Sequence, residues 1–124
     1  MPARVYVCDA TEQAALKKLM EYDPYLDKSL TEEQIGNLKS DAEANIIFSR
    51  QDYIIKDGPA LGLEREKIYL YIKASDEFLA KAEPKLKKLI QGLARVSPDM
   101  EKKIIDTIDQ ERTQAEQGFG TIFG

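Results

Sequence analysis

The chain has 124 residues, with 18 Lys and Arg, 22 Asp and Glu, and a formal net charge of −4. This length predicts one domain that folds without a disulfide or a structural metal. The absence of histidine excludes a histidine general base and histidine metal ligands, and the single cysteine, Cys8, excludes an internal disulfide and a cysteine-based zinc site. One cysteine, no signal-peptide region and no long apolar run predict a cytoplasmic protein with no membrane partner.

The charge is unevenly distributed along the chain. Residues 1–64 carry a net charge of −5, residues 65–103 a net charge of +4, and residues 104–124 a net charge of −3. An acidic chain argues against nucleic-acid binding, because the phosphate backbone requires a basic footprint. The basic middle segment still allows an anionic ligand or a partner with an acidic surface.

The first third of the chain predicts one strand and two helices. Residues 4–8 predict a short strand, with Val5 and Val7 on one face and Tyr6 and Cys8 on the other. Residues 9–21 have the apolar spacing of a helix. After a loop, Thr31 and Gln34 form a capping box that predicts a helix over residues 31–43.

Three apolar runs follow, at residues 45–49, 52–56 and 67–73. We expect them to form an antiparallel meander, with a tight turn between the first two. The third run alternates most clearly, so Tyr69 and Tyr71 share the face opposite its aliphatic residues.

The remaining sequence predicts two helices and a short tail. Residues 75–93 keep one helical phase across Pro84, which favours a single kinked helix, and Ser97 with Pro98 begins a helix that ends near Gln117. The chain is therefore predicted to be one α+β domain over residues 1–117, followed by an apolar tail at 118–124. Its small, mostly antiparallel sheet has about four strands and its helices number four, in the order β-α-α-β-β-β-α-α.

The tail contains Phe119, Ile122 and Phe123, and these large apolar residues predict a contact surface. Gly118 fits a left-handed helix cap, whereas the following residues have an extended, strand-like pattern suited to docking at a sheet edge or in a groove. Three outcomes remain open: docking on the chain's own sheet, docking on another copy or partner protein, and a frayed terminus.

A second candidate site is a ligand surface near the middle of the chain. A glycine-containing loop could hold phosphate, tyrosines on one strand face could stack a ring, and lysines at helical spacing could attract an anion. Each feature also has a structural explanation: a strand connection, half-buried packing and a solvated helix face. The residues of this surface are Gly58, Gly62, Tyr69, Tyr71, Lys81, Lys85 and Lys88.

The leading functional hypothesis is a non-catalytic cytoplasmic module that forms a homo-oligomer through its last helix and tail. The alternative is a small-molecule or nucleotide sensor domain at the ligand surface, and the third is a small enzyme that uses carboxylate or lysine chemistry. No residue is assigned as catalytic or as cofactor-binding, and none is assigned as a metal ligand because no acidic spacing matches a calcium loop. A protein partner other than a second copy is also possible at the tail.

Overall fold

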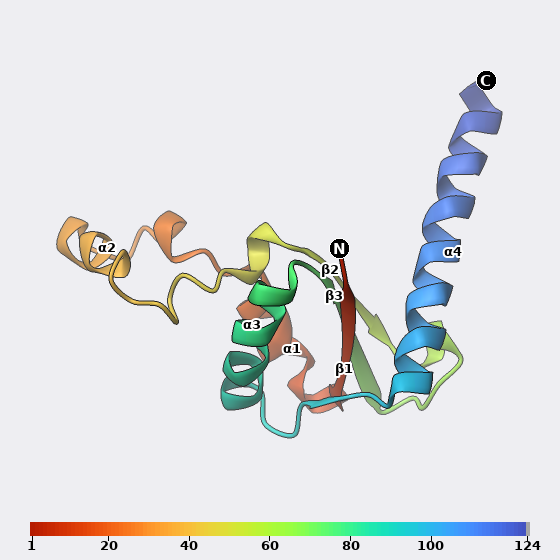
Figure 1. The fold of residues 1–124 in the computed structure, drawn as a ribbon, viewed down its shortest axis with the longest axis horizontal. Helices are drawn as coiled ribbons and strands as arrows, with labels where there is room; N and C mark the ends of the chain where they lie inside the picture. Colours follow the sequence, from red (N-terminus) through yellow and green to blue (C-terminus); the bar gives the residue numbers. More distant parts are fainter. Residues whose placement is uncertain (124) are drawn as a thin grey trace.

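A four-stranded antiparallel sheet with the strand order β2-β3-β1-β4 forms the centre of the computed structural model (Figure 1). The structure describes the backbone of residues 1–123 and the side chains of residues 1–116. The strands are β1 (Ala3–Asp9), β2 (Asp52–Asp57), β3 (Lys67–Lys73) and β4 (Ala94–Arg95). Over residues 1–123 the α-helices are α1 (Gln13–Glu21), α2 (Glu32–Leu38), α3 (Asp76–Leu89) and α4 (Pro98–Phe123). The predicted α+β fold class is confirmed.

The central strand β3 separates two hydrophobic cores. It pairs with β1 from Ala3↔Lys73 to Asp9↔Lys67, and with β2 along its other edge. Because successive strand residues face opposite sides, its aliphatic residues enter one core and Tyr69 and Tyr71 enter the other. The alternation predicted for residues 67–73 is therefore confirmed.

The first core lies between the sheet and the helices α1 and α3. Cys8 is buried here, and burial raises the pKa of its thiol, so it behaves as a small hydrophobic side chain. The buried residues that helices and sheet contribute to this core include Tyr6, Leu16, Met20, Ile68, Leu70, Ile72, Leu79, Ala82 and Leu86.

The second core lies on the opposite face, beneath α4. Val5, Tyr71 and Ile108 are buried at its centre. Glu101, in the first turns of α4, contacts β1, whereas Arg112 contacts β2 at Asp52. The helix therefore crosses the face of the sheet diagonally from β1 to β2.

The predicted strand at residues 45–49 is not formed, and the fourth strand is the short β4. Ile47 and Phe48 are instead buried in an irregular segment that leads into a single 3-10 turn. The Phe48 ring packs edge-on against Phe78, with 6.0 Å between ring centroids. Phe48 packs into the first core. The run is therefore apolar because it is buried, although it does not pair as a strand.

The ends of α2 and α3 differ from the prediction, whereas the predicted continuation of α3 through Pro84 is confirmed. The helix α2 begins with the expected capping box, in which Gln34 N–H donates to Thr31 Oγ1 at 3.1 Å, but it ends at Leu38. The helix α3 continues through Pro84 as predicted, although it ends at Leu89.

The last helix is longer than predicted. Its backbone remains helical through Gly118 to Phe123, so it does not end at a glycine cap near Gln117, and residues 118–123 are not extended. In Figure 1 this helix continues well past the end of the sheet.

On the other side of the molecule, residues 22–46 form an extension that we call the arm, with α2 at its tip (Figure 1). In the arm, Tyr25 Oη donates a hydrogen bond to Asn45 Oδ1 at 2.6 Å, which joins the outgoing and returning chains. Arg50 forms an ion pair with Asp23 at 3.0 Å, which ties the base of the arm to the start of β2.

Candidate functional site

The predicted ligand surface is divided between the two faces of the sheet. Tyr69 and Tyr71 lie under α4 with relative exposures of 8% and 2%. The Arg112 guanidinium covers the Tyr71 ring at 5.3 Å from its centroid. The lysines of the predicted surface lie on α3, which packs against the other face. The structure therefore does not bring the tyrosines and lysines to one site.

Both glycines of the predicted loop are required by its backbone conformation. A Cβ atom on Gly58 would lie 1.6 Å from the Glu64 carbonyl oxygen, and Gly62 has a φ of +71°. The Leu61 and Leu63 N–H groups both donate to the Gly58 carbonyl, at 2.9 and 2.8 Å. These amides are used inside the turn, so they do not point together toward a phosphate.

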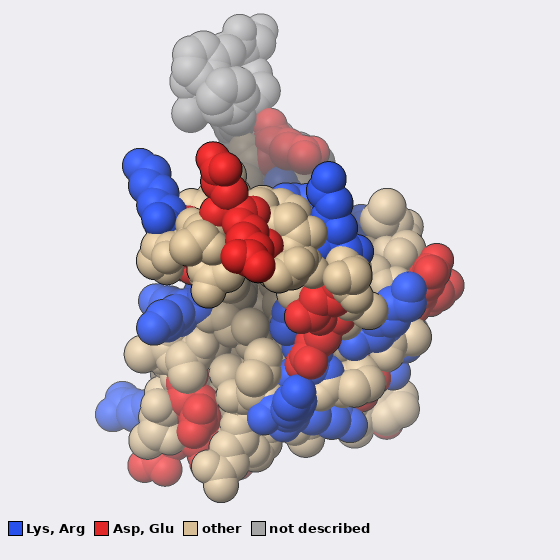
Figure 2. Space-filling view, turned by 90° about the vertical axis from the view of Figure 1, so that its left-hand side faces the viewer, with Lys and Arg blue, Asp and Glu red and all other residues tan. Residues whose placement is uncertain are grey.

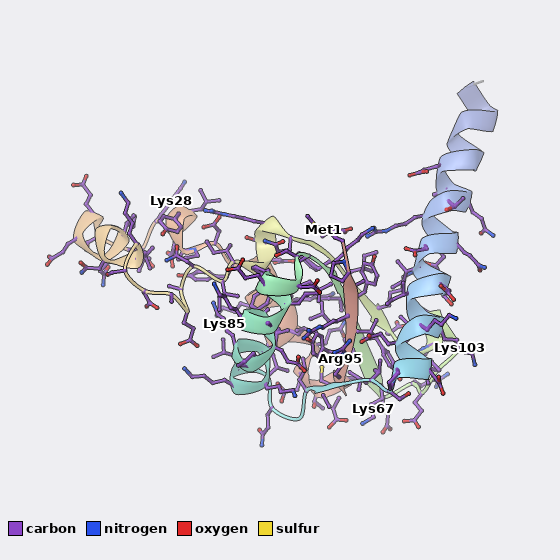
Figure 3. The ribbon with its side chains drawn as sticks, in the orientation of Figure 1. Met1, Lys28, Lys67, Lys85, Arg95 and Lys103 are labelled. Carbon is purple, nitrogen blue, oxygen red and sulfur yellow. The ribbon has the colours of Figure 1, made fainter. Side chains whose placement is uncertain are left out.

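The lysines on α3 connect this helix to the arm. Lys85 Nζ donates to the carbonyl oxygens of Glu43 and Ile46, at 2.8 and 2.9 Å. Lys88 forms an ion pair with the Glu43 carboxylate at 3.1 Å, whereas Lys81 pairs with Glu77 along its own helix at 3.2 Å. Figure 3 shows Lys85 on the side of α3 that faces the arm. Two of the three predicted lysines thus hold the returning chain of the arm.

Lys85 has an unusual environment for a lysine. Its ammonium group lies 5.6 Å from the centroid of the buried Phe48 ring. Burial lowers the pKa of Lys85, and the nearby Glu43 and Asp41 carboxylates act in the opposite direction. The side chain is therefore both a structural tie and a partly desolvated cation.

Two cavities lie beside the arm. The larger one, of about 630 Å³, lies between the end of the arm and the first turns of α3, where Ala42, Ile46 and Phe78 line it together with charged side chains. The smaller one, of about 260 Å³, lies beneath the arm and is lined by apolar side chains and Lys85. On the outer surface of this side, acidic and basic residues are interspersed (Figure 2).

A carboxylate–guanidinium pair closes the β1 edge of the sheet, and the sequence analysis did not identify it. Glu101 accepts hydrogen bonds from Arg95 at 2.7 and 2.8 Å and from the Val5 N–H at 3.1 Å. Figure 3 shows Arg95 beside the sheet near the start of α4. No local sequence signal marks this pair, because it depends on β4 pairing with β1. Its contacts are all internal, which makes it a structural element.

The interaction residues predicted in the tail, Phe119, Ile122 and Phe123, lie outside the residues whose side chains the structure describes. Their backbone is part of α4.

Within the described residues, no group of three or more acidic or cysteine side chains converges in a way that could hold a metal ion.

Comparison with known proteins provides no family assignment. No protein-family model, curated protein or solved structure matches the chain. Among the described residues, no helix combines the length and apolarity needed to cross a membrane.

Proposed function

We propose that the protein is a non-catalytic cytoplasmic association module that forms a homo-oligomer through the far end of α4. The observation that supports this most directly is the 26-residue length of α4. Its first four turns contact the sheet, through Ile104 and Ile108 and then through Arg112, and its backbone continues beyond the sheet to Phe123 (Figure 1). A helix that leaves its own domain has a segment available for another molecule.

The helical phase strengthens this argument. Residues three and four positions apart share one side of a helix, so positions 119, 122 and 123 lie on the same side of α4. Continued backward at this period, the same side contains Ile108, which is buried against the sheet. The sheet-packing side of α4 therefore resumes with large apolar residues in the sequence where the helix backbone has passed the sheet, and an apolar stripe on such a helix favours an interaction surface.

A second copy is the partner that the sequence itself supplies. Closed homo-oligomers most often use a two-fold interface in which the same surface occurs on both subunits. Two copies of α4 can pair their apolar sides in this way. The net charges of −3 on residues 104–124 and +4 on residues 65–103 have opposite signs, which favours attraction between copies.

The test is the mass of the protein in solution, measured by light scattering across a range of concentrations. We expect the full chain to be a dimer or a larger closed oligomer, and a variant without residues 118–124 to be a monomer. The double variant Phe119→Asp with Phe123→Asp should also be monomeric, because it places charges on the proposed contact side.

The matched control is Thr121→Asp, which adds the same charge on the opposite side of the helix and should leave the oligomer intact. A full chain that stays monomeric at every concentration would contradict the proposal. So would an oligomer whose mass is unchanged by the deletion.

A further inference from the structure

The cavity beneath the arm has the composition of a small-molecule site. Its volume is about 260 Å³, and its walls come from α1, from both chains of the arm and from the segment that ends at Phe48. Ile47 and Phe48 form a buried floor, whereas Leu30 and Leu38 are half-buried on the arm. Ligand pockets typically combine such apolar walls with a small number of placed polar groups.

Lys85 is the one charged side chain among the described residues that line this cavity. An ammonium group has three donors, and two of them are occupied by the Glu43 and Ile46 carbonyl oxygens. The Glu43 carboxylate is directed to Lys88 instead. Within the described part of the chain, no carboxylate forms an ion pair with Lys85, so its third donor is available to an anion.

We propose that this cavity binds a small carboxylic acid with an unbranched apolar chain, with the carboxylate at Lys85 and the chain against the apolar walls. A partly desolvated cation attracts an anion more strongly than the same cation in water. The apolar walls favour a hydrocarbon body, and at ~30 Å³ for each water-sized group the cavity holds about eight such groups. Octanoate, an anion with an eight-carbon chain, is close to this size.

This site is independent of the association surface at the end of α4. The cavity and α4 lie on opposite faces of the sheet. Ile46 lines both this cavity and the larger one beside it.

The test uses calorimetric titration of the full chain with octanoate, octanol and octylammonium, three probes that share one chain length and differ in charge. We expect octanoate to bind most tightly, octanol more weakly, and octylammonium not to bind, because its charge repels Lys85. Equal binding of octanoate and octylammonium would overturn the proposal, because it would show unspecific uptake of amphiphiles.

Two alanines of the arm provide a matched pair for locating the site. Ala44 lines the small cavity, whereas Ala42 is exposed and lines the larger one. We expect Ala44→Phe to fill the small cavity and to weaken octanoate binding by about tenfold or more, with Ala42→Phe close to the unsubstituted chain. Equal effects of both substitutions would place the ligand elsewhere and overturn the proposal.

A second pair tests the role of the cation. Lys85→Met keeps an apolar stem and removes the charge, and Lys81→Met removes a charge that lies outside the small cavity. We expect Lys85→Met to abolish the preference for octanoate over octanol, and Lys81→Met to retain it. An unchanged preference in Lys85→Met contradicts the proposal. If Lys85→Met loosens the arm and binds neither probe, the alanine pair decides.

Discussion

Glu101 joins three separate parts of the chain at one carboxylate. It is 9% exposed, and it accepts hydrogen bonds from Arg95 on β4 and from the backbone of Val5 on β1. Burial alone would raise the pKa of this carboxyl, but the hydrogen bonds from Arg95 and Val5, together with the positive charges of Arg95 and Arg4, outweigh burial and lower the pKa. The Val5 N–H lies on the side of β1 that the two-residue β4 does not cover, and Glu101 satisfies it there.

The direction of this shift predicts a pH dependence. A carboxylate whose pKa is lower in the folded state stabilises the fold above its unfolded pKa, near 4.5, and this contribution is lost as the pH falls through the folded value. We expect Glu101→Gln to reduce the free energy of unfolding near pH 7 by about 1.5–3 kcal/mol. The variant should also lose less stability than the unsubstituted chain between about pH 7 and pH 3.

The measurement is urea denaturation followed by circular dichroism at several pH values. Some acid sensitivity should remain in the variant, because Arg112 also lowers the pKa of Asp52. Glu77→Gln is the control, since this side chain is 81% exposed in an ion pair within one helix, and such pairs contribute little to stability. Parallel pH profiles for Glu101→Gln and the unsubstituted chain would refute the assignment.

At the scale of elements, α4 has an anchored half and a half that leaves the body. Among the side chains described up to residue 116, the last contacts that hold it to the sheet are polar: Arg112 donates two hydrogen bonds to Asp52, at 2.8 and 2.9 Å, and Lys56 pairs with Glu111 at 2.7 Å. The Arg112 guanidinium also stacks over Tyr71. The planar guanidinium of arginine can pair with a carboxylate through two hydrogen bonds and stack on a ring at the same time, whereas the ammonium of lysine would supply only the charge.

We therefore expect Arg112→Ala to loosen α4 beyond Ile108 while leaving its first turns in place. Hydrogen exchange measured by mass spectrometry should show faster exchange over residues 109–116 and unchanged exchange over 99–107. Arg112→Lys should give an intermediate result. Exposed Gln114→Ala serves as the control, and uniform acceleration along the whole helix in Arg112→Ala would argue against a local anchor.

At the scale of the whole molecule, one sheet supports two cores with different functions in our proposals. The face under α1 and α3 extends into the arm and the cavity at Lys85, and the face under α4 leads to the proposed oligomer contact. Because the central strand β3 contributes to both cores, loss of either core should disturb the other.

Association through α4 predicts that stability depends on protein concentration. Binding of a second copy to the folded state alone stabilises that state by mass action. We expect the midpoint of thermal unfolding to rise with concentration for the full chain, and to be independent of concentration for the variant without residues 118–124. A midpoint that is constant for both proteins would count against an oligomer at the end of α4.

Local patterns were sufficient for the elements whose signals lie within a few residues. The alternation over 67–73, the capping box at Thr31 and the helical phase across Pro84 were all predicted from the sequence and are confirmed. Each depends on a backbone period or on a hydrogen bond between near neighbours. The fold class followed from the succession of these elements.

The candidate sites depended on contacts that no local pattern contains. The lysine spacing predicted a stripe on α3, but only the folded arm shows that Lys85 lines an apolar cavity and that Tyr69 and Tyr71 lie on the other face. The apolar run around Phe48 had the composition of a strand, but in the structure it is an irregular buried segment that packs against Phe78. A helix-breaking glycine at 118 predicted an end to α4, yet the helix continues.

The sequence by itself determined the class of fold, the periods of its elements and the chemistry that is absent, because these follow from composition and from neighbours along the chain. Tertiary structure decided which apolar run pairs as a strand, which charges meet, where cavities form and how far α4 extends beyond the sheet. Those features depend on contacts between residues far apart in the sequence, such as Val5 with Glu101 and Ile46 with Lys85. Such contacts form only when the elements pack together, so no local pattern predicts them.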